Sequence, residues 1–416
     1  MKLRIFLLLF LIPISFSITQ AQVTIGSEIN PNAGAMLDLK QYAPGSDNTT
    51  ATKGLGLPRV NLTTPNALSD IADAVGFEVE HTGLVVYSLN KCLNKTGRDN
   101  GVYVWTGSEW QALNAKIVRS SDVYELSDTR AGITETYTYS RFGDAGIWMT
   151  ENMRATHYAD GTIINLHDGG NQYATPAYAY PSSTIDGWNT PSTSYDQNPK
   201  QGLLYNWAAA TNNYNTVKSR TNQGQNAGTS PSGNEVETDN NLAIQDYRNY
   251  YVVQGICPDG WHVPSDREWN ELEKEIYENA DKYSTYTNAE VVGWNSSDPW
   301  LATWESDDAN WRGSNTSVGH GFAMQHSCFL MNTSYSGGTS KLSEEGGFSI
   351  LLTGSVNTSS MGAYGTSSFI WSSSGGSNDN IGYTRQWNRG QVKVSRDRTY
   401  RRNLHSVRCK KNDLNP

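Results

Sequence analysis

The chain has 416 residues and a formal net charge of −9, from 32 Lys and Arg against 41 Asp and Glu. This length is enough for two or three domains, and a chain this acidic lacks the basic excess that general nucleic-acid binding requires. Only 18% of the residues are charged while 11% are aromatic, with 38 Gly, a composition that suits an extracellular, loop-rich β protein.

The first residues have the pattern of a secretory signal peptide. Lys2 and Arg4 precede an apolar run over residues 5–14, and the small residues Thr19 and Ala21 suit cleavage before Gln22. The run is too short to span about 30 Å of hydrocarbon, and no lipoprotein-type cysteine follows the expected cut. We therefore expect residues 1–21 to be a removed leader and the mature chain to be exported without a transmembrane span.

Residues 22–115 predict a small, β-rich module. Four short apolar stretches bounded by Gly, Pro, Asn or Asp predict strands, at residues 36–39, 53–60, 83–87 and 101–110. Thr106-Gly107 suits a hairpin turn between Val104-Trp105 and Trp110. The order resembles an N-terminal module widespread in exported Bacteroidetes proteins, which is similar to head segments of trimeric fibre proteins. Because so small a module has few long apolar runs, we expect it to serve assembly or docking, packing against the second domain or copies of itself.

A turn and a capped helix mark the centre of the second domain. Cys257-Pro258-Asp259-Gly260 supplies turn residues, and Ser265 with Glu268 three positions later forms a capping box. Trp269, Leu272 and Ile276 recur at helical spacing, which predicts one buried helix face. The side chains expected to stay in water are those of Glu271, Lys274, Glu275 and Glu278.

This stretch resembles the signature of the Fibrobacter succinogenes major paralogous (FISUMP) domain family, and further family motifs occur in order. They are IWMTENMR (147–154) with YADGT (158–162), GLLYNWAA (202–209), GFSI (347–350), WSSS (371–374) and SVRC (406–409). The resemblance covers roughly residues 118–412. It implies a C-type-lectin-like α+β fold, akin to the formylglycine-generating-enzyme group, on exported bacterial proteins of mostly unassigned function. We therefore place this domain at residues 116–412, followed by a tail at 413–416.

Four cysteines in an exported chain favour disulfides over metal or redox chemistry. Three pairings are possible from the sequence alone. The family pattern implies a bridge between Cys257 and Cys409. Cys92 and Cys328 then either bridge the two domains or stay free.

Residues 293–311 form the most aromatic segment and are predicted as a loop. Their aromatic residues and carboxylates alternate along the segment: Trp294, Asp298, Trp300, Trp304, Glu305, Asp307, Asp308 and Trp311. Aromatic faces beside amides and carboxylates bind sugars, and the same oxygens suit a structural Ca²⁺. We assign Trp294, Trp300, Trp304, Trp311 and Asp307 to ligand binding, the alternative being that the tryptophans fill the core. The lectin sugar motifs W-N-D and E-P-N are absent, because Arg389 follows Trp387-Asn388, which argues against Ca²⁺-dependent sugar binding.

Four soft or borderline ligands lie close together at His320, Met324, His326 and Cys328, the last three on one face if this were a strand. A copper or zinc site is one interpretation. We favour the other, a core strand that carries Met324, Phe322 and a buried cysteine, and predict no metal site.

A basic run occupies the C-terminal part of the chain, against the single acid Asp397. Its members are Arg385, Arg389, Lys393, Arg396, Arg398, Arg401, Arg402, Arg408, Lys410 and Lys411. The run predicts either a patch for an anionic glycan, lipopolysaccharide or acidic partner, or a solvated strand edge protected by cations.

No catalytic motif accompanies these features: the chain lacks G-x-S-x-G, H-E-x-x-H, a Walker loop and a catalytic cysteine pair of the formylglycine-generating type. We expect a non-catalytic surface protein, an adhesin, fibre tip or accessory subunit of an outer-membrane assembly, that recognises a protein or glycan partner. Homo-oligomerisation would run through residues 22–115. The alternative is an exported glycan- or metal-dependent enzyme related to the formylglycine-generating fold.

Overall fold

The computed structural model describes residues 23–412 apart from 33–34, 45–48, 72–73, 94–99, 114–119, 213–252, 306–309, 329, 331–336 and 376–379. The expected leader and tail, together with Asp307 and Asp308, lie outside this part of the chain. Among the described helices, none combines the length and hydropathy that crossing a membrane requires. The chain divides into two compact units, Met1–Pro58 and Arg59–Pro416.

The first unit contains two short strands, β1 (Val23–Ile25) and β2 (Leu37–Leu39), which pair in parallel. None of the hydrophobic residues described between positions 23 and 58 is buried. This sheet therefore has no hydrophobic core of its own.

The second unit opens with a four-stranded sheet in the order β3-β4-β5-β6. Its strands are β3 (Arg59–Val60), β4 (Val85–Ser88), β5 (Gly101–Trp105) and β6 (Trp110–Ala112). The predicted hairpin is confirmed, because Trp105 pairs with Trp110 across β5 and β6 and their rings meet edge to face at 5.4 Å. Both rings are buried with Leu62 and Leu68. The described residues of 22–115 thus contain two separate sheets, and of these only the second encloses a hydrophobic core.

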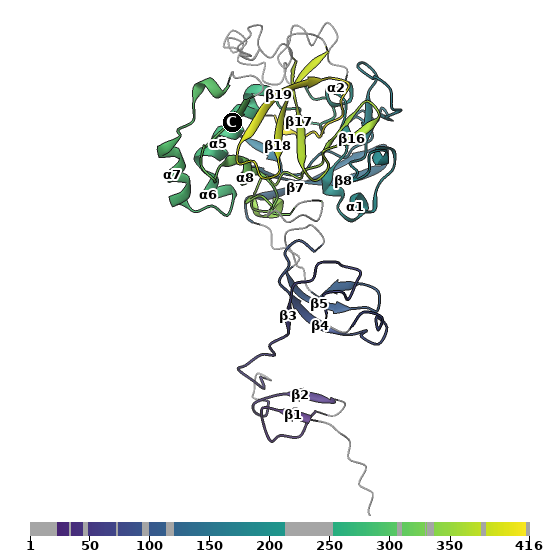
Figure 1. The fold of residues 1–416 in the computed structure, drawn as a ribbon, viewed down its shortest axis with the longest axis vertical. Coiled ribbons are helices and arrows are strands. Elements are labelled where there is room, and N and C mark those ends of the chain that lie inside the picture. Colours follow the sequence, from purple (N-terminus) through teal and green to yellow (C-terminus); the bar gives the residue numbers. More distant parts are fainter. Residues whose placement is uncertain are drawn as a thin grey trace, which may run out of the picture. The chain divides into compact units, whose positions relative to one another are not determined.

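Two larger sheets build the rest of the second unit. One has the order β13-β20-β9-β8-β7 and the other β14-β19-β18-β17. In Figure 1, β17, β18 and β19 run side by side in yellow. The strands of the five-stranded sheet are β7 (Val123–Arg130), β8 (Ile133–Arg141), β9 (Ile147–Met149), β13 (Trp261–His262) and β20 (Lys410–Lys411). Those of the four-stranded sheet are β14 (Asn310–Arg312), β17 (Ser367–Gly375), β18 (Ile381–Asn388) and β19 (Val394–Tyr400).

Smaller elements complete the domain. The remaining strands are β10 (Asn165–Leu166), β11 (Ala177–Ala179), β12 (Leu204–Tyr205), β15 (Ser355–Asn357) and β16 (Ser360–Gly362). Within the described residues, the α-helices are α1 (Thr193–Gln197), α2 (Trp207–Thr211), α5 (Asp266–Glu278), α6 (Ala280–Tyr283), α7 (Asn288–Ser297) and α8 (His320–Met324). Short 3-10 turns include Ala302–Glu305 and Ser343–Glu345. The described part is β-rich with few helices, an α+β composition.

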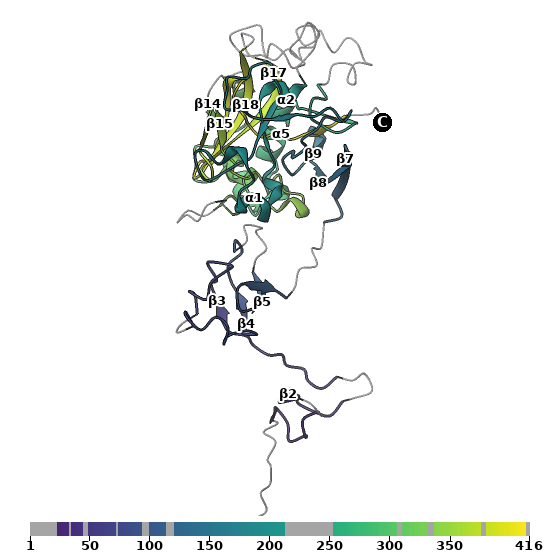
Figure 2. The same ribbon diagram turned by 90° about the vertical axis from the view of Figure 1, so that its right-hand side faces the viewer.

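Helix α5 is the predicted capped helix, and its start is confirmed. The Ser265 side chain accepts from the backbone of Glu268, whose carboxylate accepts from the backbone of Ser265. Trp269, Leu272 and Ile276 are fully buried as the spacing predicted. The Trp269 ring lies 5.1 Å from Trp148 of β9 and 5.9 Å from Trp387 of β18. Helix α5 therefore packs between the two large sheets, as Figure 2 shows.

Candidate functional site

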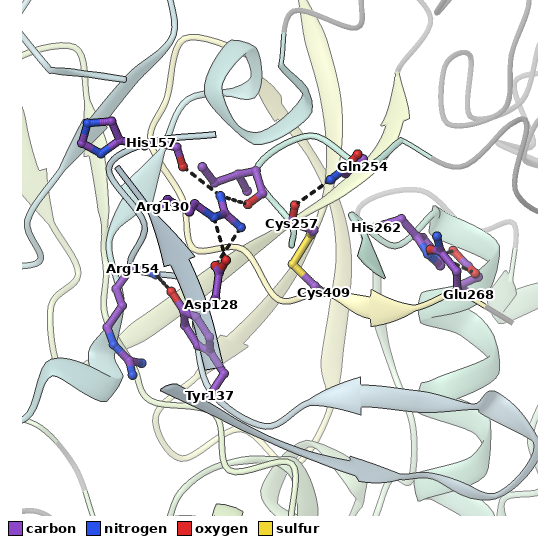
Figure 3. Close-up of a disulfide and its surroundings, with 12 residues drawn as sticks. Asp128, Arg130, Tyr137, Arg154, His157, Gln254, Cys257, His262, Glu268 and Cys409 are labelled. Atoms are coloured by element: carbon purple, nitrogen blue, oxygen red, sulfur yellow. Dashed lines mark hydrogen bonds and ion pairs between the residues drawn. A yellow bond between two sulfur atoms is a disulfide. The ribbon is translucent and has the colours of Figure 1, made fainter. Parts of the chain in front are cut away.

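Two disulfides fasten the second unit. Cys257 pairs with Cys409, as the family pattern implied, and Cys92 pairs with Cys328, one of the two outcomes that the sequence left open. The first bridge stands just before the neighbouring strands β13 and β20. Beside it, Arg130 donates to the backbone carbonyls of Ile256 and His157, both at 2.8 Å, and pairs with Asp128 (Figure 3). The second bridge ties the β3–β6 sheet covalently to the C-terminal domain.

The residues weighed as copper or zinc ligands do not form a metal site in the described part of the chain. His320 and Met324 lie on helix α8, so the predicted strand is wrong. Cys328 is bonded to Cys92, and its backbone N–H donates to Nδ1 of His326 at 2.9 Å. Within the ranges that the structure describes, no group of three or more His, Cys, Asp or Glu residues is arranged to hold a metal ion.

Half of the C-terminal basic run is buried, so the run as a whole is neither the surface patch nor the solvated strand edge that were predicted. Five of its members are buried, namely Arg385, Arg396, Arg401, Arg408 and Lys410. Of the ten cations, only Arg398 is exposed. The alternation of β18 and β19 turns Arg385 and Arg396, which are directly paired across the two strands, toward helix α5.

These arginines form a buried ion network with two carboxylates of α5. Nε of Arg396 lies 2.8 Å from Asp266, and Arg385 binds both Asp266 and Glu273. Arg312 of β14 donates to Glu273, with its Nε at 3.1 Å. None of these five side chains is more than 1% exposed. The network holds one helix and three strands of the four-stranded sheet together.

The electrostatics of the network keep Glu273 ionised. Burial opposes its charge, but the guanidinium groups of Arg312 and Arg385 outweigh burial and hold the pKa of Glu273 well below its usual range. Nε2 of His320 lies 3.3 Å from the same carboxylate. Burial lowers the pKa of His320, so its imidazole is neutral at pH 7.

Neither Asp266 nor Glu273 was predicted as a site residue from the sequence. They are seven positions apart on α5, and Asn270, which binds Arg385 at 2.8 Å, lies between them. Polar residues at this spacing share a helix face. The sequence signal for this ion network was therefore a stripe of polar residues beside the apolar stripe of α5, together with arginines at alternating positions of the strands.

The aromatic segment over residues 293–311 is only partly the loop that was predicted. Its first residues belong to helix α7, and Trp294 is 1% exposed with its Nε1 donating to the carbonyl of Tyr277 at 2.9 Å. Trp294 is therefore core, and its assignment to ligand binding is wrong. An indole with no accessible face has no surface on which a ligand can stack.

The other tryptophans of the segment are half-buried. Trp300 and Trp304 meet edge to face at 5.3 Å, and each also packs on Tyr277 at 5.7 Å. Nε1 of Trp300 donates to Glu305 at 3.1 Å, and Arg312 of the ion network donates to the carbonyl of Trp304. Trp311 lies on β14. Ligand binding by these three residues stays a prediction, and that by Asp307 falls outside the described residues.

Truncating Trp294 is expected to destabilise the domain. Trp294→Ala should lower the free energy of unfolding by about 3–5 kcal/mol, because it empties a well-packed core position and leaves the Tyr277 carbonyl without its donor. Urea denaturation of both proteins measures the loss. Val292→Ala, an exposed position on the same helix, serves as the control and should change stability by less than about 0.5 kcal/mol. Equal stability of Trp294→Ala and the wild type would contradict the core assignment.

Comparison with known families gives two matches. A model of the Fibrobacter succinogenes major domain matches residues 144–411. The chain belongs to this family. A model of a phage tail like trimerisation region matches residues 24–130. No curated protein and no solved structure matches the chain.

The motifs of the Fibrobacter succinogenes major domain are linked to one another inside this protein. Arg408 of SVRC donates to Asn152 of TENMR at 2.8 Å and to the carbonyls of Phe348 and Ser349 in GFSI. Nε1 of Trp371 in WSSS donates to the carbonyl of Tyr205 at 2.8 Å. Ser374 of WSSS accepts from the backbone of Asp266 at 2.9 Å. These motif residues therefore hold the core of the domain together.

Proposed function

We propose that this chain is an exported, non-catalytic surface or structural protein that assembles through its N-terminal region and recognises a protein or glycan partner through its C-terminal domain. The observation that carries the proposal is the match to a trimerisation region over residues 24–130. That stretch includes a sheet whose hydrophobic residues are all accessible in the single chain. Such a segment gains stability when other copies cover it.

Export and surface location are supported by the two disulfides. Such bonds persist in oxidising compartments and are rare in the cytosol. The N-terminal leader pattern of the sequence agrees with this. Within the proposal, the protein is an adhesin, fibre tip or accessory subunit at the outer-membrane surface.

A C-type-lectin-like fold for the C-terminal domain is the finer part of the proposal. It is supported by the placement of β20, the last strand, beside β9 from the beginning of the domain. Recognition would use loops such as the one that carries Trp300 and Trp304, which keep part of their rings accessible. A non-catalytic role is supported by family motifs that serve core contacts.

The assembly in this proposal has a direct test. The full chain, purified after export, is expected to sediment as a trimer at micromolar concentration. Analytical ultracentrifugation across a dilution series measures the mass and its concentration dependence. A chain that remains monomeric over the whole series would overturn the proposed assembly.

A further inference from the structure

One face of the β1–β2 sheet consists entirely of accessible apolar side chains. In the parallel register Val23 lies beside Leu37 and Ile25 beside Leu39. Side chains alternate between the two faces of a strand, so these four residues share one face. Their exposed fractions are 49% for Val23, 57% for Ile25, 54% for Leu37 and 40% for Leu39. We call this set the apolar face.

The opposite face of the same sheet is covered by the chain itself. Asp38 points to that side, where its carboxylate accepts from the backbone of Asn32 at 2.8 Å and pairs with Lys40 at 2.8 Å. Lys40 is buried and donates to the carbonyl of Asn30 at 2.6 Å. Residues that connect β1 and β2 therefore cover the polar face of the sheet. On the apolar face, no hydrophobic residue of the described unit is buried.

A two-stranded sheet with one bare apolar face is marginally stable in water. The β3–β6 sheet does not need other copies of the chain to form a core, because Trp105, Trp110 and Leu62 already fill its own. The trimerisation match extends over both sheets. The first sheet leaves its four apolar side chains 40–57% exposed. The second sheet already has a core, and the apolar residues of its other face, Val85, Tyr87, Val102 and Val104, are half-buried.

We propose that the apolar face is the core of the trimer, where the same four side chains from three copies meet around a common axis. This inference rests on the proposed assembly. It adds that the β1–β2 sheet, and not the β3–β6 sheet, mediates the assembly. The occupant is two further copies of this chain, for two reasons. The trimerisation match begins at residue 24, inside β1. The face carries no charge, so identical faces do not repel one another.

Three copies also suit the size of the face. Paired strands lie about 4.8 Å apart, so a face of two strands is a narrow strip. Three strips around a threefold axis cover one another without an open end, because a heterologous contact with a rotation of one third of a full turn closes into a ring. The competing occupant is a different protein, which would leave the purified chain monomeric.

A single charge on the apolar face tests the inference in the full chain. Leu37→Asp is expected to weaken the trimer by roughly a thousandfold and to give monomers at micromolar concentration, because three carboxylates would be enclosed at the axis without cations. Leu37→Ile, which keeps the side chain apolar, should remain trimeric. Val79→Asp is the matched control. Val79 is an apolar residue that is 76% exposed and lies outside the apolar face, so this variant should also remain trimeric.

Sedimentation of the four proteins separates the possible failures. A trimeric wild type with a trimeric Leu37→Asp variant would overturn the inference and leave the proposed assembly standing. A wild-type dimer would overturn the threefold packing. A wild-type monomer would remove the proposed assembly and the inference with it. The thermal melt of Leu37→Asp should match that of the wild type for the second compact unit, Arg59–Pro416, so that dissociation is not mistaken for misfolding.

Discussion

Replacing both Cys257 and Cys409 by serine should lower the free energy of unfolding of the C-terminal domain by about 5 kcal/mol. The bridge joins residues 152 positions apart, and opening so long a loop restores much conformational freedom to the unfolded chain. Both cysteines are fully buried beside Trp261 and Val263, so the variant also loses packing there. Guanidinium denaturation followed by tryptophan fluorescence measures the difference.

The second disulfide supplies the matched control. Cys92 lies in the β3–β6 region and Cys328 in the C-terminal domain, and their bridge joins residues 236 positions apart. The Cys92→Ser, Cys328→Ser double variant therefore also restores conformational freedom to the unfolded chain, but it leaves the packing around Trp261 and Val263 intact. Protease should cut residues 59–112 more readily in this variant than in the Cys257→Ser, Cys409→Ser variant. Equal protease sensitivity of residues 59–112 in the two double variants would contradict this assignment of the Cys92–Cys328 bridge.

Features that depend on neighbouring residues were predictable from the sequence. The capping box of α5 needs only Ser265 and Glu268, and the hairpin between β5 and β6 needs only a turn with two flanking strands. The apolar spacing of Trp269, Leu272 and Ile276 likewise fixed the buried side of α5. The family motifs added the order of the elements and one disulfide.

Features that depend on distant partners were not predictable in the same way. Arg385 and Glu273 are 112 positions apart, and Arg396 and Asp266 are 130 positions apart. A run of cations predicts a surface position, because isolated charges are costly to bury. Only the folded chain shows that two carboxylates of α5 meet these arginines and offset that cost.

The aromatic segment was mispredicted for a different reason, because a local signal was overlooked. Thr287 and Glu290 form a capping box at the start of α7, and this local signal lies upstream of the stretch from which a loop was predicted. Once the helix begins at Asn288, its geometry carries Trp294 into the core against Tyr277 and Tyr286. Trp300, Trp304 and Trp311 come after the end of the helix and are half-buried.

Arg385→Met is expected to lower the free energy of unfolding at pH 7 by about 3–5 kcal/mol, because removing one partner leaves buried carboxylates short of a cation. The loss should shrink in acid. The folded-state pKa of Glu273 is depressed, so its stabilisation is present above the unfolded pKa of about 4.3 and is lost as the pH falls through the folded pKa. Without Arg385 the pKa of Glu273 in the folded protein moves back toward its value in the unfolded chain. The free energy of unfolding of the variant then depends less on pH than that of the wild type. Urea denaturation at pH 7, 5, 4 and 3 measures both effects.

Arg398→Met is the matched control for this prediction. It makes the same substitution on β19, two positions from Arg396, but at an exposed side chain, so its effect should stay below about 1 kcal/mol. A double-mutant cycle of Arg385→Met with Glu273→Gln should show coupling, because the two side chains are in contact. The decisive result is the pH profile. A loss for Arg385→Met that is the same at pH 3 as at pH 7 would mean that packing, and not the ionised Glu273, accounts for the contribution of this arginine.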